Sequence, residues 1–292
     1  MFLSLFFITV LLLSAGSPAH AEDTFRVEVL PSVVKQGGVC LIRASGPPSI
    51  ESVHGEFRGE KFTMVFEGQN GTYEGLVGID MDTLPAMYEI KVVAIDGEGR
   101  VYSSPYSLKV EKVDFGVQKL SLPSFMVDLD AKTLERVNKE ARRLTALFQA
   151  YGDERLWRGA FIRPVDGELS ASFGLGRIIN GQSRNPHTGI DLRAEAGTPV
   201  LACNSGVVVL VDELFFGGKS VIIDHGWGIY SMYFHLSETL AREGDRISKG
   251  TILGRVGSTG RSTGSHLHWG VRMNGARVDP LSLLRLTEHL RE

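Results

Sequence analysis

Five of the eight histidines in this chain fall between residues 187 and 268, and two of them are separated by a single residue in His266-Leu267-His268. On a β-strand, residues two apart point to the same face with their Cα atoms roughly 6.5 to 7 Å apart. Two imidazoles would then share one site, while Leu267 points into the core. The spacing predicts a strand on which one histidine binds a metal ion and the other faces a substrate.

A second pattern is His187-Thr188-Gly189-Ile190-Asp191. In a fully extended segment the histidine and the aspartate would lie about 13 Å apart, too far to share one ion. We therefore expect Gly189, with its wide backbone freedom, to let the chain fold between them. Hydrolytic zinc sites hold the ion with three protein ligands and a water molecule. His187, Asp191 and one histidine of the 266–268 pair would complete such a set.

Two further histidines are less defined by pattern. His235 ends the apolar stretch Tyr233-Phe234-His235-Leu236, and strand alternation is equally compatible with a buried position and with one facing the site. His225 lies in a His-Gly turn after a predicted strand and is interpreted as structural. The glycine-rich stretch GSTGRSTGS, residues 257–265, would let a substrate backbone approach closely. It lacks the G-K-[ST] sequence of a phosphate-binding loop.

In this order and at these separations, the motifs resemble those of the LytM/lysostaphin-type zinc endopeptidases. The resemblance covers the C-terminal half through the segments PVDGELSASFG, NPHTGIDLRAEAGTPVLACNSGVVV, VIIDHGWGIYSMYFHL and EGDRISKGTILGRVGSTGRSTGSHLHWGVRMNG. It implies that His187, Asp191 and His268 bind Zn²⁺. It also implies that His266 and His235 are the catalytic residues beside the water and the scissile carbonyl. An extra loop (GLGRIINGQSRN), Ser231 and Trp269 depart from the family pattern and bear on substrate choice.

The resemblance implies a peptidoglycan hydrolase: a zinc metalloendopeptidase that cuts glycine- or D-alanine-containing cross-link peptides of bacterial cell wall. Metal-activated water would attack the peptide bond, with one histidine as acid/base and the other stabilising the oxyanion; which does which stays open. The alternative is a LytM-like non-catalytic activator of another wall hydrolase, although such proteins usually lack the metal ligands. A lipoyl/biotinyl-type carrier would need a modifiable lysine, and Lys219 lacks the usual sequence setting. A purely structural zinc site would usually be closed and cysteine-rich.

The elements that must position these residues are mainly β. Short β-rich runs separated by turn signals predict an Ig-like N-terminal β-sandwich over residues 22–112. A linker over 113–158 is expected to hold an amphipathic helix with Asp130 as N-cap that buries its apolar stripe against a neighbouring domain. The stripe recurs every three or four positions between 128 and 151 and consists of Leu134, Val137, Ala141, Leu144, Phe148 and Tyr151. Residues 159–286 form a β-rich LytM-type peptidase domain, related to lipoyl/biotinyl-type barrels, and 287–292 a C-terminal tail. The sandwich shows no catalytic motif and is interpreted as a spacer, or alternatively as a partner-binding or shielding module.

Charge and the N-terminal sequence limit which binding partners and which cellular location are expected. The formal net charge is -3 and no basic block is present, so nucleic acid is not expected as a partner. Residues 1–21 combine a short apolar run with an A-x-A cleavage site and predict a signal peptide, with an uncleaved anchor as the alternative. The mature protein is then expected in the periplasm or outside the cell, without stable membrane insertion; its oligomeric state is left open. Cys40 and Cys203 fall in different predicted domains and are interpreted as small buried residues rather than a disulfide.

Overall fold

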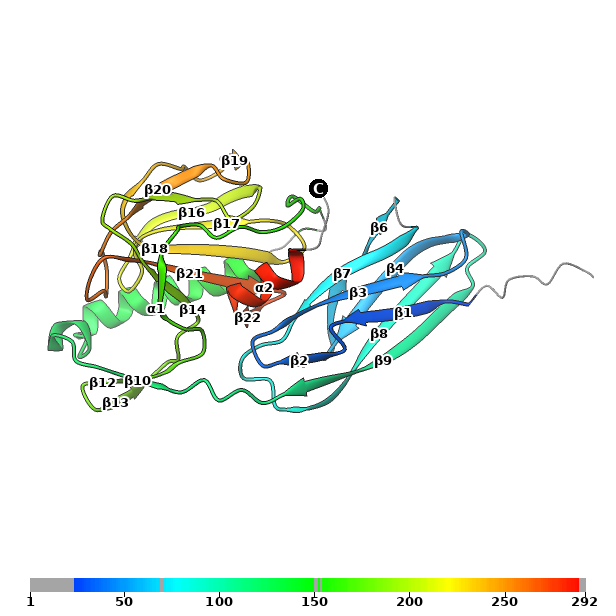
Figure 1. The fold of residues 1–292 in the computed structure, drawn as a ribbon, viewed down its shortest axis with the longest axis horizontal. Coiled ribbons are helices and arrows are strands. Elements are labelled where there is room, and N and C mark those ends of the chain that lie inside the picture. The colour runs from blue at the N-terminus through cyan, green and yellow to red at the C-terminus, as the bar shows by residue number, and fades with distance from the viewer. Residues whose placement is uncertain (1–23, 69–70, 150–151, 153, 289–292) are drawn as a thin grey trace, which may run out of the picture.

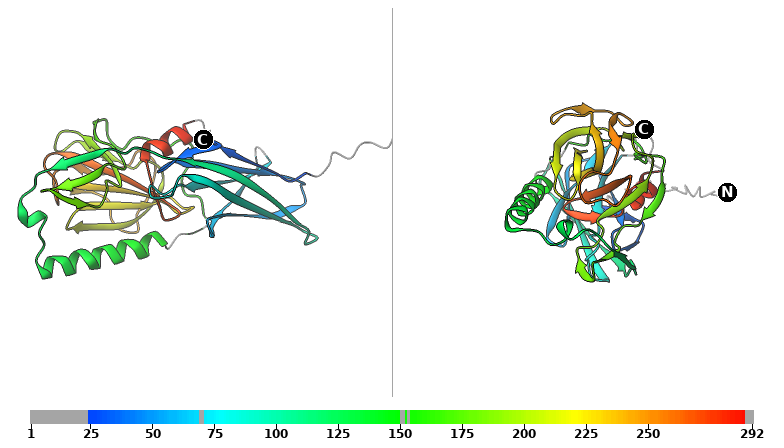
Figure 2. Two further views of the ribbon diagram at one scale, coloured as in Figure 1. Left: turned by 90° about the horizontal axis from the view of Figure 1, so that it is seen from below. Right: turned by 90° about the vertical axis from the view of Figure 1, so that its left-hand side faces the viewer.

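The computed structural model describes residues 24–68, 71–149, 152 and 154–288, and it is mainly β, as predicted (Figure 1). An N-terminal sandwich and a C-terminal β-rich half lie end to end, with one long helix alongside the C-terminal half (Figure 2). The predicted signal peptide, Tyr151 and residues 289–292 of the predicted tail lie outside the described residues. None of the helices in these ranges is both long enough and apolar enough to cross a membrane.

The N-terminal half is a sandwich of two sheets. The first has the order β1-β3-β7-β6 and consists of β1 (Arg26–Leu30), β3 (Val39–Ser45), β7 (Thr72–Gly78) and β6 (Val65–Glu67). The second has the order β2-β9-β8-β4-β5 and consists of β2 (Val33–Lys35), β9 (Val101–Glu111), β8 (Ala86–Asp96), β4 (Ile50–Phe57) and β5 (Glu60–Thr63). Strand alternation explains why the two sheets pack face to face: Ile90, Val92 and Ala94 of β8 are fully buried between the sheets, while Lys91 is exposed.

The C-terminal half is built on a ten-stranded sheet whose central path runs β11-β14-β21-β18-β17-β16-β19. Its strands are β11 (Glu168–Ala171), β14 (Gly189–Arg193), β15 (Pro199–Leu201), β16 (Gly206–Leu214), β17 (Gly218–Asp224), β18 (Ile229–Thr239), β19 (Arg246–Ile247), β20 (Ile252–Val256), β21 (His266–Met273) and β22 (Ala276–Val278). A helix that was not predicted, α2 (Pro280–Thr287), follows them; Asp279 accepts a hydrogen bond from the Leu281 N–H and caps it.

A three-stranded sheet joins the linker to the C-terminal half. Its order is β10-β12-β13, with β10 (Val117–Leu120), β12 (Gly176–Ile179) and β13 (Gln182–Arg184). Strand β10 pairs with β12 in parallel, so a segment predicted as linker contributes a strand beside the extra loop noted in the sequence. A short 3₁₀ turn, η1 (Ser124–Met126), and helix α1 (Ala131–Gln149) follow β10.

Helix α1 begins as predicted, with Asp130 Oδ1 accepting the Thr133 N–H at 2.7 Å. Only its C-terminal turns pack against the sheet: Phe148 is buried in a cluster with Leu210, Ile222, Tyr230 and Met232. The prediction of one buried stripe is wrong for Leu134, which is 48% exposed, and for Ala141, also exposed. Polar contacts hold this earlier part instead, with Glu140 accepting the Phe215 N–H at 2.9 Å and Arg136 donating to the Glu213 carbonyl at 2.6 Å.

The sandwich and the C-terminal half share one hydrophobic core, which includes Val39, Leu41, Leu76 and Met81 of the sandwich. Gly78 lies so close to the other half that a Cβ there would fall 2.8 Å from Val278 Cγ1 and 3.0 Å from Met273 Cβ. These contacts are at the Met273 end of β21, whereas His266 begins that strand, roughly 23 Å away along an extended chain. At this point the sandwich therefore contacts the end of β21 opposite to His266, beside β22 and α2 (Figure 1).

Arg277 fastens this junction with a bidentate ion pair, its Nε lying 2.9 Å from Asp80 Oδ2 and one Nη 2.6 Å from Oδ1. We expect Arg277→Ala to lower the free energy of unfolding by about 1–3 kcal/mol, because the half-buried Asp80 carboxylate loses its charged partner. Urea unfolding monitored by tryptophan fluorescence measures this. Arg285→Ala is the matched control: the Arg285 side chain is 65% exposed and lies 3.5 Å from Asp279, so this pair should contribute less than about 0.5 kcal/mol. Equal losses in both variants would contradict the assignment.

A buried polar chain explains the structural interpretation of His225. Its Nδ1–H donates to the Ser205 carbonyl at 2.7 Å, which leaves Nε2 to accept from the Ser231 hydroxyl at 2.7 Å. Ser231 in turn hydrogen-bonds with the Tyr233 hydroxyl, which also accepts the Cys203 N–H. All four side chains are buried in the sheet. The network ties β16, β17 and β18 together, and burial lowers the pKa of His225 from 6.5 to about 4.

This shift predicts a pH-dependent stability. As the pH falls, the unfolded chain takes up the His225 proton near pH 6.5, whereas the folded protein resists it until about pH 4. The contribution, up to about 3 kcal/mol, is therefore complete above pH 6.5 and is lost between pH 6.5 and 4. We expect unfolding free energies of the metal-loaded protein to fall more steeply over this range in wild type than in His225→Gln, which cannot be protonated. Parallel pH profiles of the two proteins would refute the assignment.

Candidate metal centre

Strands β14 and β21 bring the predicted metal ligands together. They pair antiparallel, with Asp191 directly opposite His268 and Arg193 opposite His266. Residues directly opposite in such a pair share one face of the sheet, so Asp191 and both histidines of the 266–268 motif point to the same side. Leu267 is fully buried on the other side, as expected from strand alternation.

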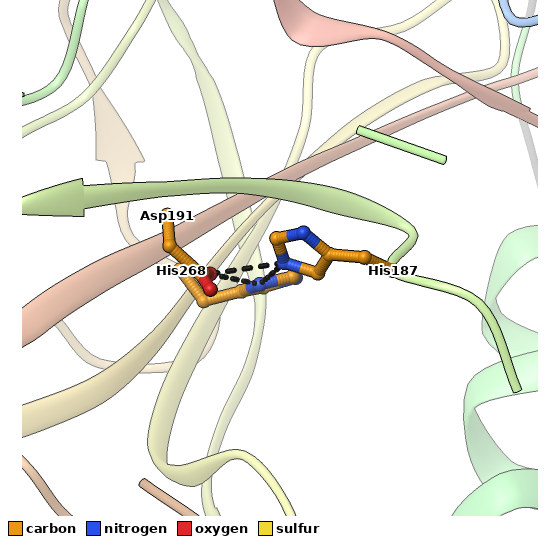
Figure 3. A group of neighbouring side chains, drawn as sticks. All are labelled: His187, Asp191 and His268. Atoms are coloured by element: carbon orange, nitrogen blue, oxygen red, sulfur yellow. Dashed lines mark hydrogen bonds and ion pairs between the residues drawn. The ribbon is translucent and has the colours of Figure 1, made fainter. Parts of the chain in front are cut away.

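The side chains of His187, Asp191 and His268 meet at a single point (Figure 3). His187 Nε2 lies 3.0 Å from Asp191 Oδ1 and 2.9 Å from His268 Nδ1, and His268 Nδ1 lies 2.9 Å from the same carboxylate oxygen. Ligand atoms around a tetrahedral zinc ion, with bonds of about 2.0 Å, are separated by about 3.3 Å. The three atoms thus have close to the spacing that one such ion requires.

The segment before β14 sets the orientation of His187. Its Nδ1–H donates to the Ser172 carbonyl at 2.9 Å, and this bond orients the ring so that Nε2 faces the cluster. Gly189, which was expected to let the chain fold between His187 and Asp191, lies at the start of β14 and is not among the residues with positive φ. It is needed for space: a Cβ at this position would lie 2.7 Å from His268 Nε2 and 2.5 Å from the Trp269 carbonyl oxygen.

The charges of the cluster fit a divalent cation. Burial acts to raise the pKa of Asp191, but its contacts with the His187 and His268 rings hold it well below its usual range. Burial also lowers the pKa of His268 to about 4, so near pH 7 a neutral His268 imidazole faces the Asp191 carboxylate. His187 Nε2, Asp191 Oδ1 and His268 Nδ1 lie 2.9–3.0 Å from one another, and at most one proton can be shared among their three lone pairs. A bound cation would satisfy all three, and this donor set suits zinc.

His235 and His266 flank this cluster, and both have the same tautomer. His235 Nδ1–H donates to the Thr259 carbonyl at 2.8 Å and His266 Nδ1–H to the Gly264 carbonyl at 2.8 Å, so both present Nε2. The two ring centroids are 4.7 Å apart, and His266 Nε2 is 3.8 Å from Asp191 Oδ1. Burial, with the adjacent His268 and His266, lowers the pKa of His235 to about 3.

Strand alternation left the side of His235 undecided, and a backbone irregularity decides it. His235 has φ +65°, in the left-handed region that residues other than glycine rarely adopt, and the register of β18 shifts just beyond it. Phe234 is therefore also at the site, where its ring stacks on His268 with the planes 9° apart. The glycine-rich residues 257–265 line the same place through the carbonyls that hold His235 and His266.

Two arginines at the site were missed by sequence reasoning. Arg177 lies in the extra loop, and its Nη2 is 3.7 Å from Asp191 Oδ2. Arg261 lies in the glycine-rich stretch, with its guanidinium carbon 4.0 Å from the ring centroid of Phe216. The extra loop was the only sign of the first in the sequence, since its pairing with β10 cannot be read from spacing.

Comparisons with known proteins agree with this geometry. Peptidase family M23 matches residues 185–280, a range that includes Asp191 and all five histidines found between residues 187 and 268. The chain is 44% identical over 104 residues to the DD-carboxypeptidase/endopeptidase Mpg of Neisseria meningitidis, covering 36% of this chain and 24% of that protein. It is 33% identical over 145 residues to the peptidoglycan DD-endopeptidase ShyA of Vibrio cholerae, covering 49% and 31%. The matches thus span about a quarter to a third of these curated relatives.

One solved structure matches nearly the whole length. It is the crystal structure of a protein described as a peptidase M23 from Pseudomonas aeruginosa, with a TM-score of 0.66 and 30% identity. The match covers 87% of this chain and 95% of that one, so it includes the sandwich as well as the metal centre. With both halves matched to one solved relative, and the ligand motifs inside the family's matched region, the chain belongs to peptidase family M23.

Proposed function

We propose that this protein is a zinc-dependent endopeptidase that hydrolyses the peptide cross-links of bacterial peptidoglycan. The convergence of His187 Nε2, Asp191 Oδ1 and His268 Nδ1 on one point carries the proposal. The names of the relatives support the substrate, since Mpg is described as a DD-carboxypeptidase/endopeptidase and ShyA as a peptidoglycan DD-endopeptidase. Under this proposal the protein acts outside the cytoplasm, in the periplasm or beyond, after residues 1–21 have directed its export.

In this mechanism His187, Asp191 and His268 hold the zinc ion. When bound there, zinc supplies Lewis acidity, which polarises a peptide carbonyl and makes a water molecule a stronger acid. The fixed Nδ1–H bonds to Thr259 and Gly264 keep the Nε2 atoms of His235 and His266 directed at the site. One of these rings takes the proton of the attacking water and returns it to the leaving amine. The other, when protonated, donates to the developing oxyanion.

The test is mass spectrometry of the fragments released from purified peptidoglycan of defined cross-link structure, with and without a chelator. We expect fragments with a new amine and a new carboxylate at the cross-link, and their loss on chelation and return with added Zn²⁺. Metal-loaded protein that releases no fragment from several wall types would overturn the proposal. That result would favour a non-catalytic activator of another wall hydrolase.

A further inference from the structure

Arg177, Arg184 and Arg261 lie near one another beside the metal centre, and among the described residues Asp191 is the one carboxylate that forms an ion pair with any of them. Arg177 of β12 lies 3.7 Å from Asp191 Oδ2, as described above. Arg184 of β13 is the direct cross-strand partner of Arg177. Arg261 lies close enough to both for their charges to act on it: burial, and then Arg177 and Arg184, lower its pKa to about 10.

The pairing of Arg177 with Arg184 opposes folding. Like charges directly opposite each other in an antiparallel pair destabilise a sheet. The Nε of each guanidinium is buried and has no hydrogen-bond partner among the described residues. Arg184 donates through Nη2 to Gln182 Oε1 at 2.7 Å and to the Val127 carbonyl at 3.4 Å, neither of which carries a charge. Arrangements that oppose folding in this way are expected at functional sites, where a bound ligand can supply the missing negative charge.

Arg261 is held in place on a rigid support. Its guanidinium stacks on the Phe216 ring, and the backbone N–H of Arg261 donates to the Phe216 carbonyl at 3.0 Å. The preceding residue, Phe215, donates its N–H to Glu140 of helix α1. Helix α1 and the β16–β17 turn thus fix the position of Arg261, while the β10-β12-β13 sheet fixes the positions of Arg177 and Arg184.

Neutralisation of the Asp191 carboxylate does not by itself explain why three arginines gather here. A single guanidinium neutralises a single carboxylate, and Arg177 is the one near enough to do so. With a divalent cation bound, Asp191 is already compensated, and two more guanidiniums would disfavour the metal by repulsion. The excess positive charge therefore matches something negative on the substrate.

We propose that Arg177, Arg184 and Arg261 form a subsite for a carboxylate of the substrate peptide, carried by a residue next to the scissile bond. This rests on the proposed endopeptidase function. Arg177 is within about one residue length of a metal ligand, so the recognised carboxylate belongs to a residue directly flanking the bond that is cut. Guanidinium groups suit this task because their planar N–H groups match a carboxylate. The enzyme should accordingly disfavour neutral oligoglycine bridges.

The test compares synthetic cross-linked peptides that differ only in a free carboxylate or a carboxamide beside the scissile bond. Dissociation constants are measured by calorimetry on metal-loaded His266→Ala protein, which binds with little turnover, and cleavage rates on the wild-type active site. We expect amidation to weaken binding about tenfold or more, as for loss of a charge-assisted bidentate contact. Amidating the chain-terminal carboxylate and the branching-residue carboxylate in separate peptides identifies which one is recognised.

Substitutions in the same background then assign the subsite. Arg177→Gln, Arg184→Gln and Arg261→Gln should each reduce the preference for the free carboxylate, and Arg184→Glu should favour the carboxamide. Arg142→Gln, an exposed change on helix α1 with the same loss of charge, should leave the preference intact. Circular dichroism and zinc content confirm that each variant is folded and loaded.

The outcomes separate the subsite from the function on which it rests. Equal affinity for the carboxylate and carboxamide peptides overturns the subsite, even if both are cleaved. A preference that persists unchanged in all three glutamine variants also overturns it. Tighter binding of the carboxylate peptide without cleavage of either peptide by the wild type overturns the endopeptidase proposal and leaves the subsite standing.

Discussion

A His187→Ala variant is expected to lose its bound zinc and its peptidase activity together. Removing Nε2 leaves two of the three converging atoms, Asp191 Oδ1 and His268 Nδ1. Loss of a mere hydrogen-bond partner of a metal-binding histidine costs about 10- to 100-fold in affinity or activity, and loss of the ligand itself should cost more. Zinc per chain, measured by atomic absorption after dialysis, and the rate of peptide release should both fall below detection.

His54→Ala is the matched control for this variant. It removes an exposed imidazole from β4 of the sandwich, far from the centre in sequence and outside its described contacts. Zinc content and rate should stay at wild-type levels. The ligand assignment would be abandoned if His187→Ala, stripped of metal by chelation, still cut peptides at the wild-type rate.

The second large effect is expected for His266→Ala, which should retain zinc and lose activity by about 10²- to 10⁴-fold, the usual contribution of a general acid or base. His266 Nε2 faces the centre but lies 3.8 Å from Asp191 Oδ1, outside the three-atom cluster. Zinc content and kcat measured on the same preparation separate the two properties. Loss of zinc in parallel with activity would assign His266 to the ligand set instead.

A milder variant tests the orientation of the same ring. Ser262 Oγ is 3.3 Å from His266 Nδ1, whereas the Gly264 carbonyl is nearer, at 2.8 Å. Ser262→Ala should therefore keep the tautomer and most of the rate. A loss as large as that of His266→Ala would show that the serine, rather than the carbonyl, holds the ring.

Sequence spacing predicted the parts of the site that depend on regular structure. The two-residue interval of His266 and His268 needed only strand alternation, and Leu267 is buried as that alternation requires. The grouping of His187 and Asp191 with His268 followed from the family resemblance and is met by the geometry. The fold class followed from the turn-separated β-rich runs in the same way.

The remainder depended on non-local or irregular features. His235 faces the site because of one positive φ, which no periodicity encodes. The burial of Leu134 was predicted from a stripe, but only the later turns of α1 reach the sheet. Gly189 was expected to allow a bend in the chain. The structure instead requires glycine at this position because a Cβ would clash with His268, which is distant in sequence and lies on another strand. Arg177 and Arg184 become neighbours only through the hairpin that follows the linker strand.

The continuous core beneath the sandwich and the peptidase half has a mechanical consequence. Val39 and Leu76 belong to the same apolar cluster as Met273 and Val278, so neither half can pivot without exposing that cluster to water. The molecule should therefore tumble as one elongated body, in which the metal centre keeps a constant direction relative to the sandwich. A partner that binds the far end of the sandwich would then also fix the orientation of the metal centre.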